Sequence, residues 1–251
     1  MSTVLETRGL TKRFGGLLAT SDVTFQLERG ARQALIGPNG AGKTTFVNLL
    51  AGELSPSAGT ISLFGDDITG VPRHRRVRRG LARTFQLNQR FPDLTPREAL
   101  TLAMAERDGW GAAWWRPLDG IAAPREEAEG LLDTLRFPVA ERARATSGLP
   151  YGRQRLLEIA LALALRPRVL LLDEPAAGVP PAESREVMQA IAALPREVAV
   201  LLIEHDMDLV FRFAARITVL AQGAVLAEGT PDEIARDSRV REAYLGVPAD
   251  G

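Results

Sequence analysis

The stretch Gly37-Pro38-Asn39-Gly40-Ala41-Gly42-Lys43-Thr44 decides the fold. It fits the pattern G-x-x-x-x-G-K-[ST], it follows the predicted buried strand Gln33–Ile36, and it opens the predicted helix around Phe46–Leu50, which ends near Gly52. Glycines let such a loop turn its backbone N–H groups inward, where they and the helix N-terminus form a nest for phosphate oxygens. The motif therefore predicts a phosphate-binding strand-loop-helix unit.

Lysine is rare in this chain, which makes the lysine of the loop informative. Of 31 basic residues, 29 are arginine, and the two lysines are Lys12 and Lys43. A lysine ammonium is a compact point charge, unlike the planar guanidinium group. We expect Lys43 to reach the β- and γ-phosphates of a nucleotide and the Thr44 hydroxyl to bind Mg²⁺, and we assign the whole loop from Gly37 to Thr45 to nucleotide binding.

The composition excludes several classes of protein. The 251 residues include 31 basic and 31 acidic side chains, 45% hydrophobic residues and no cysteine. Disulfides and thiolate metal sites are therefore excluded, and zero net charge argues against a dedicated nucleic-acid binder. The longest apolar run is Ile159–Leu165, whereas a membrane helix needs about 20 such residues. The first ten residues lack the apolar core of a secretory leader, so we expect the reducing cytoplasm.

The pattern of apolar residues changes twice along the chain. Strands are predicted near 23–27 and 61–64, helices from about 83 to 167, and strands again at 169–172, 198–203 and 217–220. Thr95-Pro96 with Glu98 predicts a capping box, and Thr230-Pro231 with Glu233 predicts another. The expected fold is an α/β P-loop NTPase (RecA-like) core with an antiparallel β subdomain and an inserted α-helical subdomain. We expect one domain, with the core at 1–84 and 167–229, the helical subdomain at 85–166 and a C-terminal helical segment at 230–251.

Two acidic residues and a histidine follow predicted buried strands. Asp173 and Glu174 come after Val169–Leu172, and His205 comes after the strand that ends at Ile203. Ligands bind at the carboxyl ends of the strands in parallel sheets, so these side chains are expected near the phosphates. Asp173 is assigned to Mg²⁺, Glu174 to orienting or activating the attacking water, and His205 to the γ-phosphate. Without the phosphate loop, a charged strand end and a structural histidine are the simpler interpretations.

A basic run, Arg73-His74-Arg75-Arg76-Val77-Arg78-Arg79, precedes the helical region. Such runs can bind nucleic acid or acidic lipid. Because the net charge is zero, a solvated basic edge is the favoured interpretation. Trp110, Trp114 and Trp115 lie in a glycine-rich connector, where they either cover a helix or meet a partner.

Taken together, these motifs resemble the ATPase subunits of ABC transporters over essentially the whole chain. The resemblance is carried by Gly37–Thr45, Gln86, Leu149–Gln154, Leu170–Pro175 and His205. Several stretches look most like the branched-chain amino acid importer ATPases; these are 82–86, 149–158, 174–178, 227–231 and 244–246.

The resemblance implies further roles, residue by residue. Phe14 matches the aromatic that stacks on adenine, although an aromatic in a sheet is more often plain core. Gln86 matches the glutamine that senses Mg²⁺ and water and connects the site to the membrane subunit. Tyr151, Gly152, Arg153 and Gln154 belong to the signature loop, which would close over the γ-phosphate of ATP bound by the opposite subunit. Two departures stand out: Pro150 replaces the usual serine, and Pro180 replaces an aspartate or asparagine.

The resemblance also implies cofactors, partners and a cellular location. ATP and Mg²⁺ are the expected cofactors, and transmembrane permease subunits and a second ABC ATPase subunit, identical or related, are the expected partners. A periplasmic or extracellular solute-binding protein would act indirectly, and no nucleic acid is expected. The chain would lie peripherally on the cytoplasmic face of the inner membrane.

Other functions remain open. An exporter ATPase for lipid or polysaccharide is the nearest alternative, and a soluble ABC ATPase acting on nucleic acid is a third. The short insertion and single phosphate loop disfavour the last. A small-molecule P-loop kinase would leave Gln86, the signature-like loop and His205 unexplained.

Overall fold

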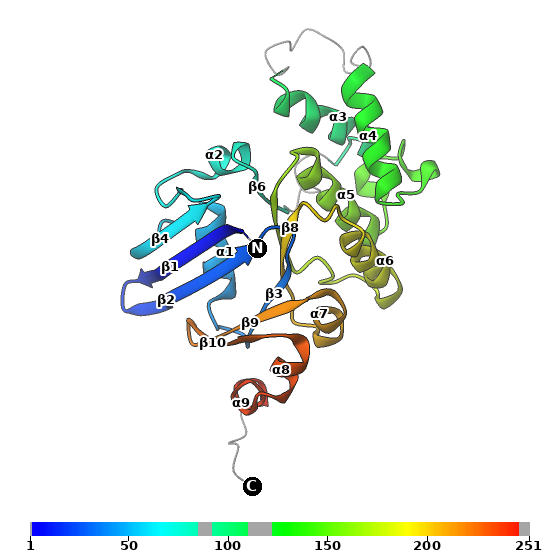
Figure 1. Cartoon of the computed structure of the whole chain (residues 1–251). Coiled ribbons are helices and arrows are strands. Elements are labelled where there is room, and N and C mark those ends of the chain that lie inside the picture. Colours follow the sequence, from blue (N-terminus) through cyan, green and yellow to red (C-terminus); the bar gives the residue numbers. More distant parts are fainter. Residues whose placement is uncertain (1, 85–91, 110–121, 246–251) are drawn as a thin grey trace. The chain divides into compact units, whose positions relative to one another are not determined.

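The computed structural model describes residues 2–84, 92–109 and 122–245, and it divides into two units (Figure 1). The first contains 1–81, 168–174 and 195–251, and the second contains 82–167 and 175–194. Residues 175–194, which the sequence predicts as part of the core, belong to the second unit. Within the described residues, no helix is long and apolar enough to cross a membrane.

The described residues form two sheets, and every strand of these sheets except β6 lies wholly in the first unit. An antiparallel sheet of order β2-β1-β4-β5 comprises β1 (Thr3–Phe14), β2 (Leu17–Glu28), β4 (Ala58–Leu63) and β5 (Asp66–Asp67). A sheet of order β10-β9-β3-β8-β7-β6 comprises β3 (Arg32–Ile36), β6 (Leu81–Arg83), β7 (Val169–Asp173), β8 (Ala199–Ile203), β9 (Arg216–Ala221) and β10 (Ala224–Gly229). Strands β7, β8, β3 and β9 run parallel, so their carboxyl ends share one edge. Gln222 and Gly223 form the hairpin turn between β9 and β10, and both residues have positive φ.

Helices cover both faces of the larger sheet. They are α1 (Lys43–Ala51), α2 (Arg73–Arg78), α7 (Met207–Phe213), α8 (Pro231–Arg236) and α9 (Ser238–Leu245). Because side chains alternate along a strand, Leu35 packs with α1 and the antiparallel sheet, while Ala34 and Ile36 pack under α7, α8 and α9. Phe46 of α1 meets Phe25 of β2 edge to face, with ring centroids 5.5 Å apart. The core thus fixes the strand before the loop and the helix after it.

The second unit is helical. It contains α3 (Pro96–Arg107), α4 (Ala122–Thr134), α5 (Tyr151–Ala164) and α6 (Pro181–Ala192), with single 3₁₀ turns at Val139–Glu141 and Thr146–Gly148. The predicted capping box is confirmed: Thr95 accepts from the Glu98 N–H, and the Glu98 side chain accepts from the Thr95 N–H. The predicted caps at Thr230 and Glu233 are confirmed in the first unit.

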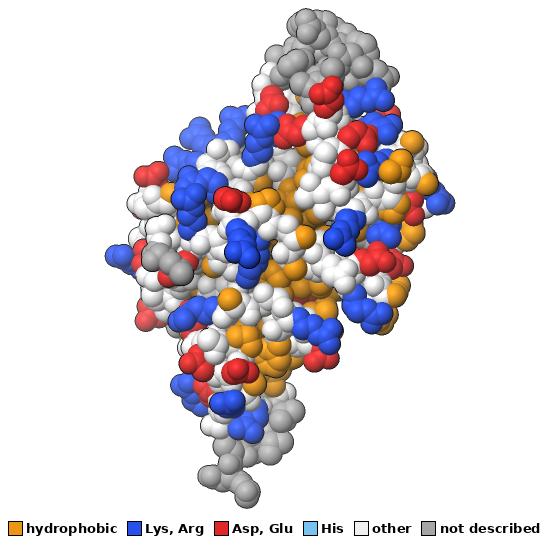
Figure 2. Space-filling view, turned by 45° about the vertical axis from the view of Figure 1, so that its right-hand side comes forward, with side chains coloured by type: hydrophobic (Ala, Val, Ile, Leu, Met, Phe, Trp, Pro, Cys, Tyr) orange, Lys and Arg blue, Asp and Glu red, His pale blue; other side chains and the backbone are white. Residues whose placement is uncertain are grey.

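The surface matches the balanced composition. Figure 2 shows basic and acidic side chains interspersed with apolar ones over the face drawn.

Candidate functional site

The phosphate loop connects β3 to α1 in the first unit. Gly37 and Gly42 have φ values of 152° and 96°, a region that residues with a Cβ atom rarely adopt. An added Cβ would lie 2.1 Å from the Leu220 carbonyl oxygen at Gly37 and 2.3 Å from the Ala19 carbonyl oxygen at Gly42. Both glycines are therefore required for the loop to pack against its neighbouring strands.

Helix α1 presents its N-terminus to the loop. Gly42 caps it in a left-handed conformation, and no side chain of the described residues hydrogen-bonds to this end. The N–H groups of the first helical turn lack intrahelical acceptors and carry the positive end of the helix dipole. The Thr44 side chain is exposed here, and Thr45 is half-buried. This end of α1 can therefore bind phosphate oxygens.

Lys43 is held against the loop. Its Nζ donates to the carbonyl oxygens of Gly37, at 2.6 Å, and Pro38, at 3.0 Å. Burial lowers the pKa of Lys43, while the nearby carboxylates of Glu174 and Asp173 act in the opposite direction. The ammonium therefore lies within the electrostatic reach of both predicted acidic residues.

Arg76 holds the other end of α1. The side chain is buried, and its guanidinium donates to the carbonyl oxygens of Leu49 and Leu50 at 2.8 Å each, and to those of Thr69 and Val71. These bonds satisfy carbonyls at the helix C-terminus, where a cation also matches the helix dipole. Burial lowers the pKa of Arg76 to about 10. Sequence reasoning missed this role, because Arg76 lies within a uniformly basic run.

The strand ends bring the predicted acidic and histidine residues together. In the parallel register Asp173 of β7 pairs with Ile203 of β8, and the Glu174 N–H donates to the Ile203 carbonyl oxygen at 2.9 Å. Glu174 has a φ of 45°, an uncommon conformation for a residue other than glycine and one that is frequent at functional sites. His205 Nδ1 lies 3.9 Å from a carboxylate oxygen of Glu174.

A further carboxylate, which sequence reasoning missed, belongs to this group. Glu204 is buried, accepts a hydrogen bond from the His205 N–H, and has a carboxylate oxygen 3.8 Å from His205 Nδ1. The imidazole therefore faces two carboxylates, one buried and one half-exposed. The available sequence signal was an acidic residue directly after the apolar strand β8.

These residues fit a magnesium nucleotide. The described residues contain no cluster of three histidine or acidic side chains that could hold a metal by themselves. Mg²⁺ in nucleotide sites is usually held by one or two protein oxygens, phosphates and waters, so the Thr44 hydroxyl and the Asp173 carboxylate suffice as protein ligands.

Phe14 is not core. The side chain is 45% exposed at the end of β1, and the Lys12 ammonium lies 5.1 Å from its ring centroid. The alternative of a plain core aromatic is therefore wrong, and stacking on adenine remains a prediction. Gln86 and the three tryptophans lie outside the described residues.

The signature-like segment starts α5 in the second unit. Pro150 is its N-cap, so this position supplies neither a hydroxyl nor an N–H. The Gly152 N–H donates to the Glu183 carboxylate of α6 at 2.8 Å, and a Cβ at Gly152 would lie 2.5 Å from the same oxygen. An anion thus already occupies part of this helix end, a contact between residues 31 positions apart that the sequence did not reveal.

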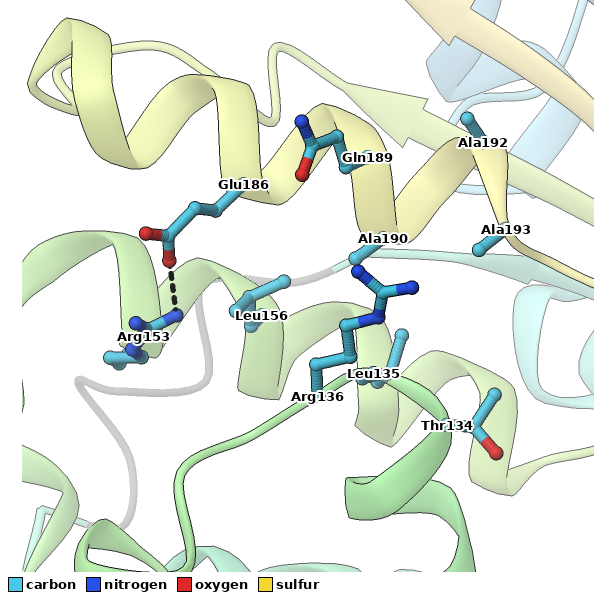
Figure 3. Close-up of a pocket in the computed structure, with 10 residues that line it drawn as sticks. All are labelled: Thr134, Leu135, Arg136, Arg153, Leu156, Glu186, Gln189, Ala190, Ala192 and Ala193. Carbon is cyan, nitrogen blue, oxygen red and sulfur yellow. Dashed lines mark ion pairs between the residues drawn. The ribbon is translucent and has the colours of Figure 1, made fainter.

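The other signature residues have local partners. Tyr151 is 41% exposed and its ring and hydroxyl contact Arg155, while the Gln154 amide donates to the Leu149 carbonyl oxygen. Arg153 pairs with Glu186 at 2.7 Å beside a cavity of about 540 Å³ between α5, α6 and the end of α4 (Figure 3). All residues lining this cavity belong to the second unit, and none of them belongs to the phosphate loop.

Comparison with known proteins agrees with the geometry. Residues 20–177 match the ABC transporter family, and residues 224–250 match the family described as branched-chain amino acid ATP-binding cassette transporter. The chain is 43% identical to the high-affinity branched-chain amino acid transport ATP-binding protein BraF of Pseudomonas aeruginosa, covering 97% of this chain and 98% of BraF.

Two further similarities extend the comparison. The lipopolysaccharide export system ATP-binding protein LptB of Acidithiobacillus ferridurans is 35% identical, with 98% of each chain covered. A solved ATP-binding cassette of an ABC transporter in its ADP conformation has a TM-score of 0.87 at 27% identity and covers 98% of this chain and 100% of its own. With its phosphate loop, strand-end carboxylates and full-length relatives, this chain belongs to the ABC transporter family of ATP-binding cassettes.

Proposed function

We propose that the chain is the ATP-hydrolysing subunit of an ABC importer that takes up branched-chain amino acids or related small solutes. The observation that carries the proposal is the convergence of the phosphate loop, Lys43, two strand-end carboxylates and His205 in one unit. The match of residues 224–250 and the 43% identity to BraF support the solute class. An exporter remains the alternative, since the LptB chain is 35% identical.

Each residue assigned to the nucleotide site has a task in the proposed reaction. The loop N–H groups and Lys43 bind the phosphates, and Thr44 and Asp173 hold Mg²⁺, with Gln86 as a further ligand. Bound Mg²⁺ would neutralise charge on the phosphate oxygens. Glu174 orients the attacking water, and His205, beside Glu174, contacts the γ-phosphate. Phe14 is exposed and is assigned to the adenine ring.

The start of α5 is assigned to ATP bound by a second ATPase subunit. Because Pro150 lacks a donor, Tyr151, Gly152, Arg153 and Gln154 remain to bind the γ-phosphate. The Gly152 N–H donates to an anionic partner within its own unit, which supports anion binding at this position. The Glu183 carboxylate has to leave before a phosphate oxygen can take its place.

ATP then joins two subunits, and its hydrolysis removes the interaction that both share, so the dimer reopens. Permease subunits would convert this motion into transport, with a solute-binding protein acting indirectly and the ATPase lying on the cytoplasmic face of the inner membrane. Co-purification of the native complex from membranes tests this assembly. Recovery with permease chains of an exporter would replace the importer proposal.

The reaction is tested by ATP turnover. Glu174→Gln should lower the rate by at least about 100-fold, in the range of general base catalysis, and keep ATP affinity. Glu197→Gln, which changes an exposed acidic residue after β7 and α6, is the matched control and should hydrolyse ATP as the parent does. Parent-like turnover by Glu174→Gln would contradict the assignment.

A further inference from the structure

We propose that α2 and the residues beside it form a surface that binds the anionic headgroups of membrane lipids. We call this surface the arginine face and define it as Arg75, Arg78, Arg79 and Arg168. The inference depends on the proposed function in one respect only, which is that the chain works at a membrane. It changes the interpretation of the basic run, for which a solvated edge was favoured from the sequence.

The structure separates the cations of the run by their surroundings. Arg76 is buried and bonded to backbone carbonyls, and Arg73 pairs with Glu53 at 3.6 Å. Arg75, Arg78 and Arg79 are exposed, and among the described residues no acidic side chain forms an ion pair with any of them. Positions 75, 78 and 79 are three and four apart, so their side chains lie on one side of this turn.

Arg168 extends the face. A Cβ added at Gly80, the residue after Arg79, would lie 3.6 Å from the Cβ and Cγ atoms of Arg168. The exposed Arg168 guanidinium lies over the Phe64 ring at 3.6 Å from the centroid. The Arg168 N–H also donates to the Gly80 carbonyl oxygen at 2.9 Å, so the backbone of Arg168 lies beside the end of the basic run. The four arginines are exposed and have no carboxylate partner among the described residues, in a chain whose total charge is zero.

Charge complementarity selects lipid over the other candidate partners. The cytoplasmic leaflet carries anionic headgroups that attract clustered Lys and Arg side chains. Cytoplasmic loops of membrane proteins carry an excess of Lys and Arg, so a permease loop would on average repel the arginine face. Guanidinium groups bind phosphate oxygens with paired, directed hydrogen bonds, which suits phospholipid headgroups.

The test is flotation of the purified full chain with vesicles made of equal parts phosphatidylglycerol and phosphatidylcholine, compared with vesicles of phosphatidylcholine alone. We expect binding to the anionic vesicles only, weakening as salt is raised. One cation near an anionic surface changes binding roughly five-fold, so Arg75→Gln/Arg78→Gln/Arg79→Gln should weaken it on the order of 100-fold.

Matched variants make the outcome decisive. Arg29→Gln/Arg196→Gln/Arg236→Gln removes the same charge from other exposed positions and should keep vesicle binding. Arg78→Gln alone should lose roughly five-fold, which keeps the test valid if the triple variant does not fold. Equal binding by both triple variants, no binding to anionic vesicles, or binding to a DNA or RNA duplex in place of the vesicles would overturn the inference.

The inference and the proposed function fail separately. Lys43→Ala should lose ATP binding and keep vesicle binding. If the parent hydrolyses ATP and does not bind vesicles, only the lipid inference falls. If it binds vesicles through the arginine face and does not bind ATP, only the proposed function falls.

Discussion

Two helix N-termini in this chain are assigned to phosphate, and they are built differently. Helix α1 follows three glycines of the loop, has a lysine as its first residue, and receives no side-chain cap among the described residues. Helix α5 follows a proline, and Glu183 already bonds to its Gly152 N–H. The first end needs only a ligand, whereas the second needs its own carboxylate displaced.

The two ends are also anchored differently. Arg76 bonds to the C-terminal carbonyls of α1, so this helix is fixed at the end opposite the loop. At α5 the contact that holds the helix is at its N-terminus, where Glu183 accepts from the Gly152 N–H, and this is the end assigned to phosphate. The difference teaches that the phosphate loop of the first unit is already shaped for a phosphate, whereas under the proposed function the second unit would have to exchange the Glu183 carboxylate for a phosphate oxygen.

The largest effect should come from Lys43→Ala. A hydrogen bond to a charged group contributes up to about 3 kcal/mol, so ATP affinity should fall on the order of 100-fold. Isothermal titration calorimetry measures this directly. Lys43→Arg keeps the charge and should still lose most of the affinity, since a planar fork cannot replace a compact ammonium. Unchanged ATP affinity of the alanine variant would contradict the claim that Lys43 and the N-terminus of α1 bind the phosphates.

Arg76→Gln should destabilise the first unit by about 3 kcal/mol, because it leaves buried carbonyl groups at the end of α1 without a donor. Arg75→Gln is the control from the same helix, and as an exposed change it should alter stability by less than about 0.5 kcal/mol. Urea denaturation of both variants gives the comparison. Equal stability of the two would contradict the anchoring role of Arg76.

His205→Ala should slow ATP hydrolysis by roughly 10- to 100-fold at saturating ATP, because Glu174 loses its imidazole neighbour. ATP affinity should change little. His74→Ala removes the other histidine, which is exposed on α2, and should leave the rate unchanged. A loss of rate shared by both variants would argue for a nonspecific effect.

Glu183→Gln should have the smallest effect. An amide can keep the contact to Gly152 without the negative charge, so a phosphate oxygen should displace it more easily. The ATP concentration for half-maximal hydrolysis should fall about two- to five-fold. Glu197→Gln removes a charge from an exposed position after α6 without touching Gly152 or Arg153 and serves as the control. A higher half-maximal concentration for Glu183→Gln would mean that the carboxylate supports the site.

Local patterns predicted much of this molecule. The phosphate loop, both capping boxes and the apolar strands depend on residues close together in sequence, and the structure has them at the predicted positions. Strand β1 was missed because Thr3–Phe14 alternates poorly and contains Gly9 with a positive φ. A strand with such an irregular pattern cannot be predicted from the alternation of apolar and polar residues.

The missed site features depend on contacts that spacing does not encode. Nothing in the run 73–79 distinguishes Arg76 from its neighbours until α2 packs on the end of α1. The Glu183 contact requires α6 to lie against the start of α5. Glu204 was overlooked because the functional assignment at this strand end went to its neighbour His205. The burial of the Glu204 carboxylate is apparent only in the structure.

The most direct measurement combines both helix ends. Light scattering of the Glu174→Gln variant at saturating magnesium ATP, with calorimetry to confirm that ATP is bound, should report a dimer, because the α5 end of one subunit then completes the site on α1 of the other. A variant that binds ATP and remains monomeric, even with its co-purifying partner chains present, would contradict the account.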